Sequence, residues 1–215
     1  GDVWIQSHVA ENLDEIRWAR ELFPRSRSYL AVYDDFGLMR ERAVYAHCIH
    51  LDEHDRALMR DTGAVAAVSP TSNLFLGSGL FPLKKTWEKQ VKVGFGTDIG
   101  AGTSFSQLQT IQEAYKVQQL QGDKLSAFEA LYHATLGGAK ALDLDGKLGN
   151  FNLGKEADFA VLELQPTALQ QLRQSRAKGL EDALFALMMM GDDRNIHSTY
   201  VYGRLAYAKP QAGAQ

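Results

Sequence analysis

Four short apolar runs divide the N-terminal part of this chain, and each leads into a polar residue. The runs cover residues 3–5, 43–46, 65–68 and 91–97, and the polar residues at their ends are His8, His47, Ser69 and Asp98. Segments with the helical spacing of apolar residues separate the runs, which is typical of βαβ units in an α/β protein with a parallel sheet. Because parallel strands end at the same edge of a sheet, His8, His47 and Asp98 are expected to lie around one point.

The spacing of these end points favours a barrel. They are 39, 22 and 29 residues apart, an average of 30. A (β/α)₈ barrel of the TIM type spends about 250 residues on eight units, or about 31 on each. A doubly wound sheet is also compatible with this spacing.

Side-chain alternation along the strands predicts which face carries the end residues. In the first run Ile5 and Ser7 share one face, and Gln6 and His8 share the other. In the last run the aliphatic side chains lie on the face opposite Asp98. Because interior and exterior positions alternate along a barrel strand, we expect His8 and Asp98 to face the barrel interior.

Capping patterns and turn signals predict the remaining elements. Capping boxes that begin at Ser104 and Ser126 predict helices to about residues 121 and 142. After about residue 145 the sequence predicts a strand over 157–162, a helix over 180–190 with a methionine-rich, core-filling end, and a hairpin over 200–207. We therefore expect two parts, a metal-dependent hydrolase barrel over 1–145 and a small β-rich appendage over 146–215.

Composition excludes several classes of protein. A net charge of −3 and a pI near 6.1 argue against nucleic acid or an acidic membrane surface as the main partner. The single cysteine, Cys48, rules out an internal disulfide and fits a reducing, cytoplasmic compartment. It also excludes the deaminases that hold zinc with a Pro-Cys-x-x-Cys element. No run approaches the roughly 18 apolar residues of a membrane span.

The strand-end residues suit metal-assisted hydrolysis. A histidine such as His8 can coordinate zinc, and Glu11, three residues later, could pass protons to a substrate nitrogen. Each residue also has an ordinary alternative: a surface histidine, a helix-entry glutamate, a buried structural histidine at position 47, or a turn-forming Asp98. The occurrence of His8, His47 and Asp98 at the ends of three of the four strands favours a metal-dependent hydrolase.

Two other features are expected to have no part in this chemistry. His50 and His54 have the spacing of a helical metal clamp, but their charged segment is more typical of a solvated helix start. Cys48 is expected to be a small buried side chain rather than a nucleophile.

Several segments of the chain are similar to one known enzyme family. They are 7–12 (SHVAEN), 46–48 (AHC), 70–74 (PTSNL), 94–98 (GFGTD), 134–139 (ATLGGA), 149–151 with 154–158 (GNF and GKEAD), and 191–196 (GDDRNI). Through them the sequence resembles the guanine deaminases of the amidohydrolase superfamily. The resemblance covers nearly the whole chain in order.

The resemblance implies a role for each candidate residue. His8 would bind zinc from barrel strand five, and Asp98, after strand eight, would bind the same ion and take a proton from the attacking water. Glu11 would shuttle a proton to the purine, and His47 would orient the water. His8, Glu11 and Asp98 would contact the substrate. The implied reaction is hydrolytic deamination of guanine to xanthine and ammonia in purine catabolism, with one Zn²⁺ per complete site, in a homodimer.

One family feature is missing from this sequence. The family carries a His-x-His pair on barrel strand one, and no such pair occurs among the six histidines here. We therefore expect the chain to be the C-terminal half of the enzyme, with barrel units five to eight, and the missing N-terminal half to be its partner in the active site. The isolated chain is expected to be inactive, since a catalytic zinc needs about three protein ligands.

Two alternative interpretations remain open at this point. The chain could come from a related amidohydrolase that acts on another aminopurine, a pyrimidine or a triazine. It could also be a non-catalytic half-barrel that acts as a binding module.

Overall fold

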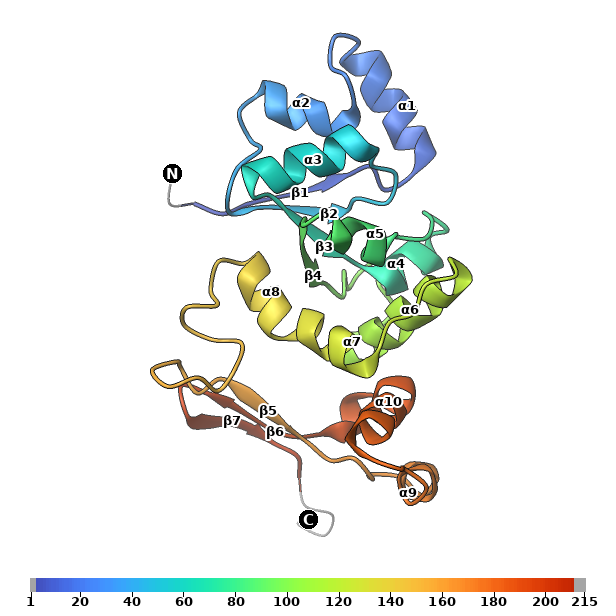
Figure 1. Ribbon diagram of the computed structural model, residues 1–215, viewed down its shortest axis with the longest axis vertical. Coiled ribbons are helices and arrows are strands. Elements are labelled where there is room, and N and C mark those ends of the chain that lie inside the picture. Colours follow the sequence, from blue (N-terminus) through green and yellow to red (C-terminus); the bar gives the residue numbers. More distant parts are fainter. Residues whose placement is uncertain (1–2, 211–215) are drawn as a thin grey trace.

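A four-stranded parallel sheet forms the centre of the molecule. The computed structural model describes residues 3–210 (Figure 1). The strands are β1 (Ile5–Val9), β2 (Ala43–His47), β3 (Val65–Val68) and β4 (Lys92–Phe95). They lie in the order β1-β2-β3-β4, so each strand pairs in parallel with the next one along the chain. A doubly wound sheet reverses its strand order, and no reversal occurs in this sheet within residues 3–210.

The two faces of this sheet differ in character. Tyr45, Ala66 and Val93 lie in one row across β2, β3 and β4, and all three are buried in the core. On β1, Ser7 contacts α2 (Tyr29–Asp35) through Tyr33, whereas His8 on the opposite face is exposed. The alternation expected from the sequence is therefore present in β1.

Short helices connect the strands and cover the sheet. Besides α2 they are α1 (Leu13–Leu22), α3 (Glu53–Thr62), α4 (Pro70–Phe75), α5 (Leu83–Glu88) and α6 (Gln107–Leu120). Figure 1 shows α1, α2 and α3 together on one side of β1 and β2. Several of these helices begin at capping side chains, such as Asn12 for α1 and the capping box of Asp52 with Asp55 for α3.

The two capping-box predictions had different outcomes. Ser126 and Glu129 form the predicted box at the start of α7 (Ala127–Ala134). The helix predicted at Ser104 instead follows Ser106, whose backbone N–H donates to the Ser104 hydroxyl. The Ser104 hydroxyl therefore stabilises a local turn before the helix, and Ser106, at the N-cap position, makes no side-chain capping bond.

The single helix predicted up to residue 142 is wrong, because it breaks at Thr135. Thr135 has φ −129° and ψ −99°, and α8 (Leu136–Ala141) begins after it. A Cβ on Gly137 would lie 2.9 Å from the Tyr132 carbonyl oxygen, so the break requires glycine there. The small residues of α8 then approach β4 closely: a Cβ on Gly94 would lie 3.4 Å from the Ala141 Cβ.

A second, antiparallel sheet lies in the C-terminal part. It contains β5 (Phe159–Leu162), β6 (Ile196–Val201) and β7 (Arg204–Ala208), with α9 (Ala168–Gln174), α10 (Leu180–Met190) and a 3₁₀ turn over Asp193–Asn195 between β5 and β6. The predicted hairpin is confirmed: Tyr202 and Gly203, with φ 54° and 71°, form its two-residue turn. Figure 1 shows this sheet at the end of the molecule opposite α1 and α2.

One continuous core joins the two parts. Leu187 and Met188 of α10 belong to the same buried cluster as Tyr45 and Val93 of the parallel sheet. Met188 is 1% exposed, which confirms that the methionine-rich end of α10 fills the core. No helix within residues 3–210 is long and apolar enough to cross a lipid bilayer.

Candidate metal centre

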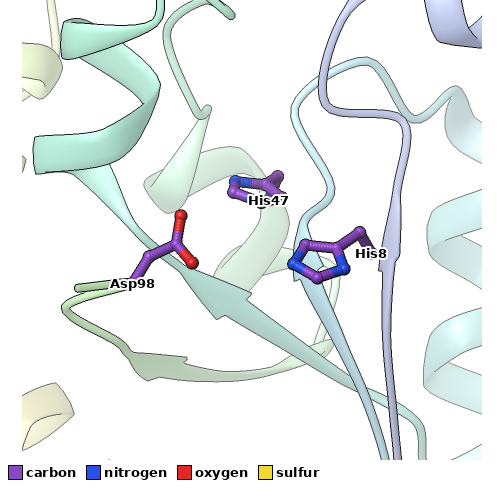
Figure 2. Close-up of side chains that lie close together, drawn as sticks. All are labelled: His8, His47 and Asp98. Carbon is purple, nitrogen blue, oxygen red and sulfur yellow. The ribbon is translucent and has the colours of Figure 1, made fainter. Parts of the chain in front are cut away.

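Three of the residues predicted from the strand ends meet at the carboxyl edge of the parallel sheet. His8, His47 and Asp98 each offer one ligand atom, and these atoms all lie within 4.8 Å of one another. Figure 2 shows the three side chains directed toward a shared space. His47 is buried, Asp98 is half-buried and His8 is exposed, so the group opens on one side to solvent.

Strand pairing places the two histidines. Val9 of β1 pairs with His47 of β2, so His8 and His47 lie on adjacent strands and are offset by one residue in register. Their rings stack at a centroid distance of 5.3 Å and an interplanar angle of 21°. The end of β1 is anchored by Tyr33, whose hydroxyl donates to the His8 carbonyl at 2.9 Å and accepts from the Ser7 hydroxyl at 2.7 Å.

Unusual backbone conformations occur around the same point. Ala10, His47, Cys48 and Asp98 all have positive φ, between 49° and 69°. Non-glycine residues rarely adopt this region, and such outliers gather at functional sites. None of these four positions is a glycine, so these turns could not be predicted from the residue types.

A tight turn follows Asp98. The backbone N–H groups of Ala101 and Gly102 both donate to the Asp98 carbonyl oxygen. A Cβ on Gly102 would lie 1.8 Å from the Thr97 carbonyl oxygen, so no residue with a side chain fits there without moving the backbone. The turn holds the Asp98 backbone at the end of β4.

His47 is oriented by a residue that sequence reasoning did not identify. Its Nδ1 lies 2.8 Å from Oδ1 of Asn73 in α4, and both residues are 1% exposed. With the Asn73 oxygen as acceptor, Nδ1 carries the proton and Nε2 presents its lone pair. The Nε2 atom lies 3.7 Å from Oε2 of Glu11. Asn73 is part of the motif at 70–74, but no spacing rule linked it to His47.

Glu11 lies beside the three-residue group rather than within it. Its Oε1 accepts a hydrogen bond from the Ser78 hydroxyl at 2.7 Å, and its side chain is 15% exposed. Its backbone N–H donates to Oε1 of Glu15 in the first turn of α1. The carboxylate is therefore held next to His47.

The other histidines and the cysteine lie elsewhere. His50 bonds through Nε2 to the Ser78 carbonyl oxygen, and His54 is exposed. Cys48 is 1% exposed, and burial raises the pKa of its thiol, which agrees with a structural role. His133 is buried among the rings of Trp87, Phe95 and Tyr132, and burial lowers its pKa.

The donor set suits a divalent transition metal. Two imidazole nitrogens and one carboxylate oxygen are ligands that zinc accepts. The tautomer that Asn73 imposes on His47 leaves a ring nitrogen free on the side of the group. The chemistry of these residues therefore fits a zinc ion.

Comparison with known proteins gives a consistent result. The sequence matches the profile of the amidohydrolase family over residues 1–206. It is 56% identical over 208 residues to the guanine deaminase of Escherichia coli (strain K12), an alignment that covers 97% of this chain and 47% of that protein. The chain therefore spans about half the length of the curated relatives it matches.

Solved structures agree with this result. A structure described as E. coli guanine deaminase superposes with a TM-score of 0.95 at 56% identity, covering 97% of this chain and 49% of that one. A guanine deaminase from C. acetobutylicum, described as having guanine bound in its active site, superposes with a TM-score of 0.84 at 33% identity, covering 95% and 49%.

Proposed function

The chain belongs to the amidohydrolase family, and from that premise we propose that it supplies part of the active site of a zinc-dependent guanine deaminase. The proposed reaction is hydrolysis of guanine to xanthine and ammonia. The observation that carries the proposal is the convergence of His8, His47 and Asp98 within 4.8 Å, beside Glu11. Similarity to guanine deaminases, one of them with guanine bound, supports guanine as the substrate.

We further propose that β1 to β4 are units five to eight of a (β/α)₈ barrel. Their sequential parallel order supports this, as does the covering of one sheet face by helices. Residues 1–145 would be the C-terminal half of the barrel and residues 146–215 part of a composite small domain. The rest of the barrel and the remaining zinc ligands would come from the half of the relatives' length that this chain does not cover.

His8 and Asp98 are the residues proposed to hold the zinc ion. When bound, zinc supplies Lewis-acid activation and lowers the pKa of a water molecule toward about 7. Both side chains are accessible on the open side of the site, where a purine and the remaining ligands could approach.

The other assignments concern protons. The Asp98 carboxylate would accept the proton of the attacking water, and His47 Nε2 would orient that water. Glu11 would pass a proton through Oε2 to a ring nitrogen of the purine, and the proton that Asp98 takes from the water would then be relayed by Glu11 to the departing amine. When the C–N bond breaks and the carbonyl forms, the proton of the added hydroxyl would return to Glu11. A positioned acid–base group of this kind contributes about 10²–10⁴ in rate. His8, Glu11 and Asp98 are the proposed contacts to the substrate.

The test is a substrate panel on the complete enzyme that contains this sequence. Ammonia release would be measured with guanine, adenine, cytosine and an aminotriazine in the presence of zinc, together with the zinc content of the protein. We expect guanine to have the highest kcat/KM and one zinc per complete site. If another substrate ranked first, guanine deamination would no longer be the proposed function.

A further inference from the structure

The carboxylate of Glu11 is held by a residue from a distant segment. The Ser78 hydroxyl donates to Glu11 Oε1 at 2.7 Å across 67 positions of sequence. Ser78 is 8% exposed, so bulk water has little access to its hydroxyl. With Oε1 engaged in this way, Oε2 is the oxygen that lies near His47 Nε2, at 3.7 Å. The contact therefore determines which carboxylate oxygen faces the candidate site.

Ser78 is itself fixed through its backbone. Its N–H donates to the Asn73 carbonyl oxygen at 2.9 Å, and its carbonyl oxygen accepts from His50 Nε2 at 2.9 Å. Gly77 and Gly79, with φ 71° and 138°, allow the chain to turn on both sides of it. A Cβ on Gly79 would lie 3.1 Å from the Ile49 side chain, so this segment is held closely against the end of β2.

These contacts link Asn73, His47, Glu11 and Ser78 into one network beside the candidate metal centre. Asn73 holds His47 through its side chain and Ser78 through its carbonyl oxygen. Ser78 holds Glu11, and Glu11 faces His47. The same short segment, residues 73–78, therefore holds both His47 and Glu11, and it lies between β3 and β4.

We propose that Ser78 is a positioning residue that fixes the Glu11 carboxylate for proton transfer, and that His50 supports it. This inference rests on the proposed function of Glu11. A proton carrier must stay within hydrogen-bonding distance of its substrate, and a misplacement of about 1 Å can lower the rate by about 10²-fold. Without the hydroxyl, Glu11 Oε1 loses its donor and the carboxylate is free to rotate.

The experiment compares three variants of the complete enzyme. Ser78→Ala removes the hydroxyl and is expected to lower kcat for guanine by about tenfold or more with little change in KM. Ser78→Thr keeps a hydroxyl and is expected to retain most of kcat. Ser126→Ala is the matched control, because it removes the hydroxyl that caps α7, away from Glu11, and it should leave kcat unchanged. Zinc content should be the same in all three.

A crystal structure of Ser78→Ala supplies a measurement that does not depend on activity. We expect Glu11 to change its side-chain conformation, so that Oε2 no longer faces His47. If the complete enzyme deaminates guanine but Ser78→Ala keeps kcat within about twofold and Glu11 does not move, the positioning role is wrong. If the unmodified enzyme does not act on guanine but Glu11 still moves in the variant, the proposed function fails and the positioning role stands.

Discussion

Glu11 is the residue whose role is tested most directly by a single substitution. Glu11→Gln keeps the size of the side chain and its contact with Ser78 but removes a carboxylate that can exchange protons. We expect guanine turnover by the complete enzyme to fall by about 10² or more. Zinc content should not change, since Glu11 lies outside the group formed by His8, His47 and Asp98. Turnover close to that of the unmodified enzyme would remove Glu11 from the mechanism.

Asn73 gives a second prediction at this scale. Asn73→Ala leaves the buried Nδ1–H of His47 without an acceptor, and an unsatisfied buried donor costs about 1–3 kcal/mol. We expect a lower free energy of unfolding in urea and a lower kcat for guanine, since the His47 ring would no longer be held in one tautomer.

The neighbouring Ser72 provides the control for this substitution. Ser72 is fully buried, and its hydroxyl has no hydrogen-bond partner within residues 3–210. Ser72→Ala should therefore cost less stability than Asn73→Ala. An equal loss in the two variants would show that the Asn73–His47 bond contributes little.

The metal-site residues could be predicted from the sequence, whereas the residues that position them could not. The meeting of His8, His47 and Asp98 follows from strand-end spacing, because parallel strands end at one edge. Asn73 and Ser78 reach the site from the segment between β3 and β4, and no periodicity describes where such a segment passes. Their contacts with His47 and Glu11 depend on tertiary packing alone.

At the scale of elements, the turn after β4 gives the next prediction. Gly102→Ala would bring a Cβ against the Thr97 carbonyl oxygen, so the turn that follows Asp98 must open. We expect the complete enzyme to lose zinc and to unfold at a lower temperature. Gly146→Ala is the control, because nothing lies within 4 Å of its added Cβ. Full zinc occupancy in Gly102→Ala would mean that this turn does not position Asp98.

The elements themselves were predictable where their patterns were long enough. The four parallel strands, the capping box at Ser126 and the hairpin at Gly203 all follow from local signals. Helices α2, α4 and α5 have six or seven residues, too few turns for a periodic apolar pattern to stand out. The break at Thr135 was missed because it depends on how closely Gly137 approaches Tyr132.

At the scale of the whole molecule, the parallel sheet has two open edges. Within the described residues, β1 and β4 each pair on one side only, and each leaves an edge of unpaired backbone groups on the other. The candidate metal centre lies at the carboxyl ends of these strands, with His8 on the edge strand β1 exposed. If these strands are half of the proposed barrel, its closure would cover both edges and add the remaining metal ligands, which would relate folding of the whole enzyme to its metal binding.

This relation predicts how residues 1–215 behave alone. If His8 and Asp98 are its zinc ligands, as proposed, the isolated chain should bind zinc at least about 10²-fold more weakly than the complete enzyme, since a lost ligand costs more than the 10–100-fold typical of a lost supporting contact. Titration calorimetry with zinc would measure this difference. The same chain, supplied with zinc, should release no ammonia from guanine.

A substitution within the isolated chain separates weak specific binding from adventitious binding. His8→Ala removes one of the two ligands and should abolish the residual zinc affinity, whereas His54→Ala, at an exposed position outside the group, should leave it unchanged. Ammonia release by the isolated chain at a rate comparable with that of the complete enzyme would contradict the prediction. In that case the residues of this chain would be sufficient for catalysis, and closure of the proposed barrel would contribute stability rather than chemistry.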